Sequence, residues 1–412
     1  MTSSIFLRIF RGLLIFTGFY PPSLLSRLWL QRSGKCLALF LTIITVLLVV
    51  QDMDNLRRIT AAVGKKPGGT EGGGGRKEVG EAGGGGPVIP FTMQLYHSII
   101  HFAVLFLRLH CPGNLRPLKD NVDRLWTLGL WTKVKCGARV WVFLGACILQ
   151  LVYTTYTSIQ MPTPFDWDNR KFYTLENWRF IIIKIVDVVW QEMPIMDIVS
   201  FGALVFMTWI TDLVQCVSRG VERHKMSLRK GGVEPLLSEI FPGGGLLQRE
   251  LDLCLKIWTI WDQALSLLGL ILLHCLWGWS ALFCLVTFNL ISSAVDLGPL
   301  NGIPLGFLFL FVCLAMKLVV ITDAAHNLHK SVASLERLLV EVRFEWERSN
   351  NNGGEIELAV VQLHALSAHR PLTVTARGHF GVGRETLTAV WGVVSTYVVV
   401  LLQFWQTTRN IP

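Results

Sequence analysis

Seven long apolar runs dominate this chain of 412 residues. The hydrocarbon core of a bilayer is about 30 Å thick, so a helix of roughly 20 apolar residues crosses it. The runs occupy residues 35–51, 89–108, 139–158, 181–210, 264–292, 303–322 and 386–405, approximately. Only 16% of the residues are charged, whereas soluble chains carry about a quarter. We therefore predict an all-α integral membrane protein with seven transmembrane helices.

The positions of the lysines and arginines predict the orientation of these spans. If the N-terminus is cytoplasmic, the cytoplasmic segments hold 26 basic residues and the opposite side holds 10. The positive-inside rule then predicts a cytoplasmic N-terminus and an extracellular C-terminus, which is opposite to a G-protein-coupled receptor. All nine cysteines fall in spans or on the predicted cytoplasmic side, which is a reducing compartment. Because the basic residues lie in alternate loops rather than in one patch, we expect no nucleic-acid partner.

Two segments interrupt this regular pattern. Residues 65–87 are rich in glycine, but no Gly-Lys-Ser/Thr follows them, so we interpret them as a flexible linker in an outer loop. The fourth run contains Pro194 and several charged residues, and it can form two stacked helical pieces. Within it, Lys184 and Asp187 are three residues apart and can pair on one helix face, or they can contribute to a ligand pocket.

The connection between spans 6 and 7 has the periodicity of an amphipathic helix. Between residues 325 and 349, apolar residues recur at helical spacing, and a glycine–asparagine turn (350–354) precedes a second amphipathic segment over 355–369. We therefore expect span 6 to continue into the cytoplasm and fold back as a helical hairpin. Such a hairpin needs a partner to cover its apolar stripe. We therefore divide the chain into spans 1–6 (residues 1–324), the cytoplasmic helical hairpin (325–385), and span 7 with a short extracellular tail (386–412).

The histidines were considered as metal ligands. His97 and His101 are four residues apart, a spacing that allows two ligands to share one metal ion. The other histidines of possible boxes lie near the inner face, so the groups do not converge as they would in a membrane di-iron oxygenase. We expect no metal site, no cofactor and no enzyme activity.

A set of aromatic and polar residues lies in the middle and outer parts of the spans. An apolar, aromatic pocket with a few polar groups is typical of a small-molecule site, whereas interfacial belts and helix packing also use such residues. The candidate pocket residues are Gln150, Tyr153, Tyr156, Asp187, Trp190, Gln191, Trp277 and Trp279.

The last span carries polar residues on one face. Thr396, Val400 and Gln403 recur at i, i+4 and i+7, so they share one side of a helix. An amide buried in lipid without a partner is costly, so we expect Gln403 to face another helix or water. A ring of such helices around an axis would place a collar of valines next to a ring of amides, which can close a pore by dewetting. A single interhelical hydrogen bond is the alternative.

The same stretch resembles a known signature. The segment "TYVVVLLQF" (396–404) is similar to the C-terminal signature of insect gustatory receptors, which is Thr-Tyr, five hydrophobic residues and Gln-Phe. The preceding "ARGHFGVGRETLTAVWGVVS" is similar to the lead-in of that family. Its matching residues are Gly378, Phe380, Arg384 and Thr386. The glycine-rich outer loop is a departure from the short loop expected of the family.

This resemblance implies a tastant-gated, non-selective cation channel of four subunits in the plasma membrane of a sensory neuron. It implies that span 7 lines the pore, with Thr396, Val400, Gln403 and Phe404 at the gate, and that a tastant pocket lies among spans 1–6. The cytoplasmic parts of the later helices would pack between subunits. The implied partners are a small-molecule tastant, monovalent and divalent cations, membrane lipid, and identical or different receptor subunits. A sugar, a bitter compound and carbon dioxide all stay open as ligands, and the alternatives are a subunit of an obligate heteromer or a transporter.

Overall fold

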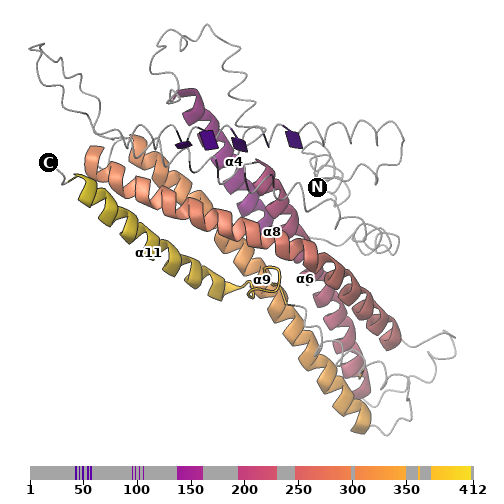
Figure 1. Cartoon of the computed structure of the whole chain (residues 1–412). Helices are drawn as coiled ribbons and strands as arrows, with labels where there is room; N and C mark the ends of the chain where they lie inside the picture. The colour runs from indigo at the N-terminus through magenta and orange to yellow at the C-terminus, as the bar shows by residue number, and fades with distance from the viewer. Residues whose placement is uncertain are drawn as a thin grey trace, which may run out of the picture.

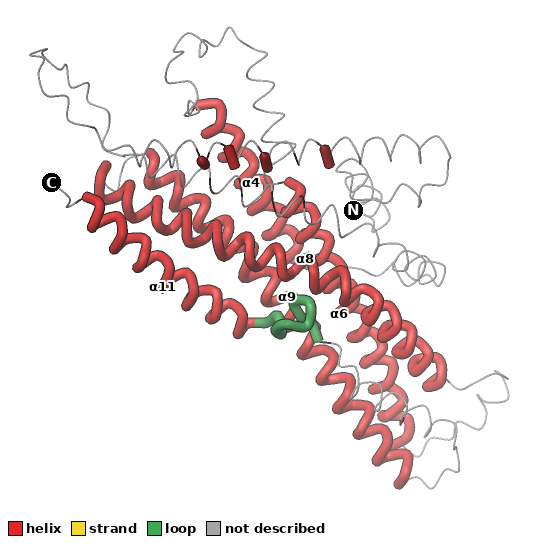
Figure 2. The backbone as a smooth tube through the Cα atoms, viewed as in Figure 1, coloured by secondary structure: helices red, strands yellow, loops and turns green. Residues whose placement is uncertain are grey.

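The computed structural model describes five continuous segments of the chain. These are residues 137–160, 194–229, 246–297, 302–348 and 373–409, with isolated positions between 42 and 57, between 95 and 105, and at 361. Within the described residues the chain is almost entirely helical, and Figure 2 shows one described loop, at residues 373–383. The helices are α4 (Ala138–Gln160), α6 (Pro194–Arg229), α8 (Leu246–Leu297), α9 (Gly302–Arg348) and α11 (Arg384–Arg409).

Five of the seven predicted spans fall on these helices. Among the described residues, four helices are long and apolar enough to cross a membrane, over Met196–Arg223, Leu268–Val295, Pro304–Glu345 and Arg384–Thr407. Helix α4 adds a shorter apolar stretch, Ala138–Tyr153. The first two predicted spans lie mostly outside the described residues, as do the glycine-rich linker and the predicted Lys184–Asp187 pair.

Three of the helices are longer than a bilayer requires. Helices α8 and α9 have 52 and 47 residues, which at 1.5 Å per residue is about 78 Å and about 70 Å. Figure 1 shows α6, α8 and α9 continuing together beyond the level at which α11 begins. We call this part the stalk and define it as residues 211–229, 246–267 and 323–348. It is joined by an ion pair between Lys225 and Glu341 and by a hydrogen bond from Gln215 to Ser331 at 3.2 Å.

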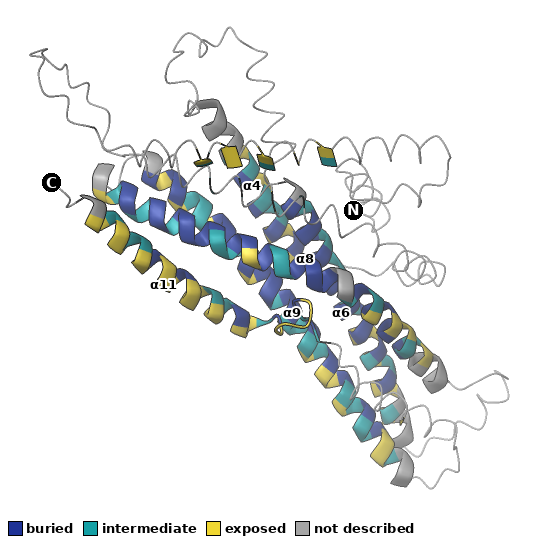
Figure 3. Cartoon of the chain, viewed as in Figure 1, coloured by how far each residue is buried: buried dark blue, intermediate teal, exposed yellow. Residues whose placement is uncertain are grey.

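The core lies between α4, α6, α8 and α9. The largest fully buried side chains include Trp209, Phe143 and Phe283, which come from three different helices. The Phe143 ring lies 6.1 Å from Phe201 and 6.2 Å from Trp279, centroid to centroid. Figure 3 shows these four helices with broad buried faces, whereas α11 is mostly exposed along its length.

Several hydroxyl groups in these apolar helices bond to the backbone of their own helix. The side chains of Ser200, Thr208, Thr211 and Ser280 each donate a hydrogen bond to the carbonyl four residues earlier, at 2.6–2.8 Å. Water cannot satisfy polar groups inside a bilayer, so local bonding of this kind lets a span carry serine and threonine.

Candidate functional site

Helix α11 is apolar but is hardly covered by the rest of the chain. Only 11% of its apolar stretch is buried, compared with 72% of the stretch in α8. Its contact with the subunit is a stripe that includes Thr386, Val394 and Val398, which are buried. An apolar helix with so much uncovered surface requires lipid or other protein around it.

The residues predicted to form a gate all lie on the uncovered part of α11. Thr396 and Gln403 are exposed in the subunit, and Val400 and Phe404 are 39% and 67% exposed. Thr396 donates a hydrogen bond to the Gly392 carbonyl at 2.9 Å, so its hydroxyl is satisfied within the helix. The periodicity therefore corresponds to a real face of the helix that no described residue of the same subunit buries.

An aromatic contact joins the first third of α11 to α8 and α9. The Trp391 ring meets the Phe283 ring of α8 edge to face at 5.0 Å and lies 5.9 Å from the Phe311 ring of α9. Phe283 and Phe311 are themselves 4.6 Å apart. Aromatic pairs of this geometry stabilise by about 0.5–1.5 kcal/mol beyond the area that they bury.

A compact loop precedes α11, and we call residues 373–383 the turn segment. It is closed by a bridge between Thr375 and Gly381, and the Val382 amide donates to the Val374 carbonyl at 2.7 Å. At its tip, Arg377 and Gly378 have positive φ values of 52° and 77°. Glycine adopts this left-handed backbone readily, which gives a physical reason for the glycine at position 378.

The turn segment is fixed directly to α8 and α9. On α9, the Nε2 atom of His329 accepts a hydrogen bond from the Val374 amide at 3.3 Å. On α8, a Cβ atom at Gly269 would lie 2.7 Å from the Arg377 nitrogen and 2.9 Å from the Thr375 carbonyl oxygen. Backbone therefore packs on backbone at this point, and only glycine allows the approach.

Thr386 of α11 forms two hydrogen bonds to the turn segment. Its buried hydroxyl accepts a hydrogen bond from the Gly383 amide and donates one to the Gly381 carbonyl, both at 3.0 Å. These bonds give partners to the Gly383 amide, just before α11, and to the Gly381 carbonyl in the turn segment. This gives a physical reason for a small hydroxyl residue at position 386.

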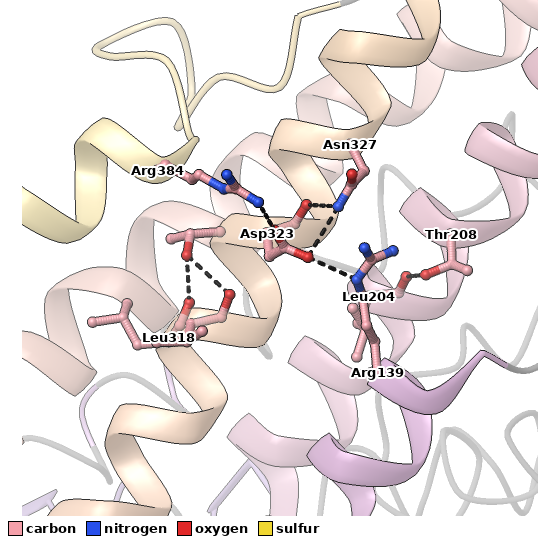
Figure 4. A network of polar contacts seen from close by, with 9 residues as sticks. Arg139, Leu204, Thr208, Leu318, Asp323, Asn327 and Arg384 are labelled. Carbon is pink, nitrogen blue, oxygen red and sulfur yellow. Dashed lines mark hydrogen bonds and ion pairs between the residues drawn. The ribbon is translucent and has the colours of Figure 1, made fainter.

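Asp323 of α9 connects the first turns of two other helices (Figure 4). Its Oδ1 atom accepts a hydrogen bond from Arg384 of α11 at 2.8 Å, and its Oδ2 atom accepts one from Arg139 of α4 at 2.7 Å. Asn327, one turn further along α9, donates to the same Oδ2 atom at 3.0 Å. The three charged residues lie at the ends of spans 3, 6 and 7 that the sequence predicts to be on one side of the membrane.

A second ionic contact lies inside the helix bundle. Lys317 of α9 is completely buried and donates to the Asp197 Oδ2 atom of α6 at 2.6 Å, and it also donates to Gln150 of α4. Charged residues in membrane spans are costly and normally pair with one another. This buried cluster joins three helices, and it assigns Gln150, a predicted pocket residue, to Lys317.

The other predicted pocket residues have separate surroundings. The Tyr153 ring lies 5.2 Å from Phe309, and its hydroxyl lies against Gly306 of α9, where an added Cβ would be 1.6 Å away. Trp279 is buried, whereas Trp277 is 54% exposed on α8. The Tyr156 side chain and all of Asp187, Trp190 and Gln191 lie outside the described residues. Gln150 and Tyr153 therefore share an α4–α9 contact, and Trp277 does not join them.

No group of three or more His, Cys, Asp or Glu side chains that could hold a metal ion occurs in the described segments. His97 and His101, the spaced pair in the sequence, lie outside them.

The sequence does not reveal which residues pair in either ionic contact. Lys317 was visible as a single charge within an apolar run, which is a signal that a counter-ion lies on another span. Asp323, Arg139 and Arg384 were visible as charges at the ends of runs. Nothing in the sequence says which of these charges meet, because that depends on which helices are neighbours.

Comparison with solved structures gives the same fold. The chain is similar to the insect olfactory receptor OR5 from Machilis hrabei in complex with eugenol, with 12% identity, a TM-score of 0.61, and coverage of 97% of this chain and 98% of that chain. A second structure of the same receptor matches with 12% identity, a TM-score of 0.63 and the same coverage. None of the curated proteins compared with the chain matches it.

The family model described as "7tm Chemosensory receptor" matches residues 88–408. The match includes all five described helices and the signature at the end of the chain. The chain therefore belongs to the 7tm chemosensory receptor family.

Proposed function

We propose that the chain is a gustatory receptor that works as a tastant-gated, non-selective cation channel in the plasma membrane of a sensory neuron. The observation that carries the proposal is the uncovered face of α11, which bears Thr396, Val400, Gln403 and Phe404. Membership of the chemosensory family and the fold shared with an olfactory receptor support it. The signature shared with insect gustatory receptors favours taste over smell.

The pore follows from arranging four copies of α11 around one axis. Val400 and Gln403 are adjacent along the helix, so four copies place an apolar ring beside a ring of amides. A narrow apolar ring empties of water and blocks ions, and a wider one fills with water and conducts. The amides carry no charge, so they accept hydrated monovalent and divalent cations without strong selection.

The same proposal assigns the remaining parts of the chain. The stalk and residues 325–385 lie in the cytoplasm and pack between subunits, and the C-terminus is extracellular. The relative whose structure holds eugenol shows that a small molecule binds in this fold. For this chain we propose a small-molecule tastant that binds among spans 1–6 and shifts the population toward the open pore.

The uncovered face of α11 also fits a second assembly. It can pack against α11 of a different receptor chain, so that the protein is a subunit of an obligate heteromer. Such a chain reaches the surface but conducts only when its partner is co-expressed. The two assemblies make the same use of Gln403.

The test is whole-cell current from cells that express this chain alone. We would apply sucrose, fructose, caffeine, quinine and eugenol in turn and compare the wild type with Gln403→Leu, which removes the amide and keeps a similar volume. We expect the wild type to give a cation current that Gln403→Leu alters or abolishes without loss of assembly. Unchanged conductance and selectivity in Gln403→Leu contradict the pore assignment.

Two controls sharpen that test. Gln215→Leu makes the same chemical change in the stalk, on α6 rather than α11, and we expect it to leave conductance unchanged. An epitope tag after Pro412 that antibodies reach on intact cells separates this topology from that of a G-protein-coupled receptor. A silent chain that is present at the surface supports the heteromer.

A further inference from the structure

We propose that Asp323 is a positioning residue for gating, because its carboxylate ties the first turn of α11 to the first turn of α4. A displacement of α4 then reaches the pore-lining helix through one shared side chain. This inference rests on the channel function proposed above and assigns the route between the two sites.

The geometry gives each arginine its own oxygen. Arg384 Nη2 lies 2.8 Å from Asp323 Oδ1, and Arg139 Nε lies 2.7 Å from Asp323 Oδ2. A carboxylate has about four acceptor positions, so both guanidinium groups bind at once without competition. Arg384 is the first residue of α11 and Arg139 is the second residue of α4, so the contact acts at the base of both helices.

Helix α4 carries two of the residues that the sequence predicts for the ligand pocket. It carries Gln150, which binds Lys317, and Tyr153, which packs on Phe309, so it shares a long contact with α9. Lys317 and Asp323 are six residues apart on α9, which is about 9 Å along a helix. The α4–α9 contact therefore has a buried ionic part at Lys317 and a partly exposed ionic part at Asp323.

The two ionic parts differ in how easily they rearrange. Lys317 is fully buried, and breaking a buried pair leaves an uncompensated charge, which is strongly unfavourable. Arg139 and Arg384 have side chains that are 47% and 65% exposed. Exposed pairs are weak and re-form readily in water. The Asp323 contact is therefore the one that can change during gating while the bundle stays intact.

The packing of α11 allows the helix to move when its first turn is displaced. The turn segment just before it is fixed on Gly269 and His329, so it provides a pivot. Beyond the pivot, α11 contacts its own subunit through one narrow stripe, and most of its apolar stretch is uncovered. A small change at Arg384 can therefore alter the tilt of α11 without disrupting a large interface.

The test is a mutant cycle on agonist sensitivity. The variants are Arg139→Gln, Arg384→Gln and the double variant that carries both changes. Each is made in the wild-type background and in the Asp323→Asn background. The agonist is the compound among sucrose, fructose, caffeine, quinine and eugenol that gives the largest wild-type current. We expect each arginine change to shift the EC50 by about threefold, since exposed pairs are modest, and the double to shift it no further than the larger single.

Asp323→Asn has a distinct expected result. It leaves two guanidinium groups facing each other without a counter-charge, so we expect a larger EC50 shift than with either arginine change. In that background, neither arginine change makes the EC50 worse. Arg384→Lys and Asp323→Glu keep the charges and restore most of the sensitivity. Lys225→Gln and Glu341→Gln form the control cycle, since this ion pair joins α6 to α9 in the stalk.

A second measurement separates this inference from the channel proposal. The apparent Tm of the purified full-length protein in detergent is measured for the same variants. Non-additive EC50 shifts that vanish with Asp323→Asn support the inference. Additive EC50 shifts at normal surface expression overturn it, even if the Tm values are non-additive, because the contact is then only structural. If the wild type reaches the surface but gives no current with any of the compounds, the channel formed by this chain alone is contradicted and the obligate heteromer is supported. The connection between α4 and α11 through Asp323 is then tested by the Tm values of the same variants. Additive Tm changes overturn the proposal that Asp323 connects the two helices.

Discussion

The backbone of Arg377 lies directly on Gly269 of α8, so closely that a Cβ at position 269 would be 2.7 Å from the Arg377 nitrogen. The residue in the turn segment and the residue in α8 are more than 100 positions apart in the sequence. This contact fixes the point from which α11 starts, and therefore fixes where the predicted gate residues lie relative to the rest of the bundle.

Gly269→Ala tests this close approach. The added methyl group meets backbone atoms that cannot rotate away, and overpacking of this kind costs about 1–3 kcal/mol. We expect a lower apparent Tm of the purified protein in detergent and reduced surface expression. Gly278→Ala is the matched control on the same helix, because its Cβ meets only the flexible end of Met196, at 3.0 Å. Equal effects of the two changes would argue against a rigid contact at Gly269.

Thr386→Val removes the hydroxyl that joins the turn segment to α11. The variant keeps the shape of the side chain but leaves the Gly383 amide and the Gly381 carbonyl without this partner. A hydrogen bond of this kind contributes about 0.5–1.5 kcal/mol to stability, so we expect a lower Tm and a changed agonist response. Thr386→Ser retains the bonds and most of the stability. Thr388→Val, at an exposed position two residues later, is expected to have little effect on either measurement.

Lys317→Met tests the buried ionic contact. The change leaves Asp197 charged and without its cation, and breaking a buried pair costs about 3–5 kcal/mol. We expect a large loss of folded protein, measured as the monodisperse fraction after detergent extraction. The double variant Lys317→Met/Asp197→Leu removes both charges and is expected to recover much of the loss. Lys225→Met, in the partly exposed stalk pair, is the control. A double variant as poor as the single would show that the charge itself is not the problem.

Phe344→Ser tests assembly through the stalk. Phe344 is large and apolar and is 64% exposed within the subunit, so it is available for contact with another subunit in the proposed tetramer. If the stalk packs between subunits, we expect the variant to dissociate the proposed tetramer, as measured by the mass of the detergent-purified complex in size-exclusion chromatography with light scattering. Phe344→Leu retains an apolar contact and is expected to preserve assembly. Tetramers that survive Phe344→Ser at nanomolar concentration would place the stalk contact elsewhere.

The apolar runs were enough to locate α4, α9 and α11, because a helix that crosses a bilayer needs a run of a certain length and composition. Run length alone did not give the full helices. Helix α8 begins at Leu246, well before the apolar run at 264, because its first part is amphipathic and packs in the stalk. The amphipathic pattern after residue 325 did indicate that α9 continues, and the structure shows one helix to Arg348.

The candidate site was predicted unevenly. The polar face of α11 could be read from spacing, since residues four and seven apart share one side of any helix. Spacing could not show which of the predicted pocket residues line a pocket. Gln150 binds Lys317. Trp277 is exposed and Trp279 is buried, although they are two residues apart. Whether an aromatic or amide side chain lines a pocket or packs against a neighbour depends on the neighbour.

By itself, the sequence determined that the chain is helical, where most of its long helices lie and which side of α11 is polar. These are local properties, set by hydrophobic length and by the period of the helix. Only the tertiary structure decided that Asp323 meets both Arg139 and Arg384, that Lys317 meets Asp197, and that the turn segment lies on Gly269. Each of these contacts joins residues far apart in the chain, and its partners are fixed by which helices pack together and in what register.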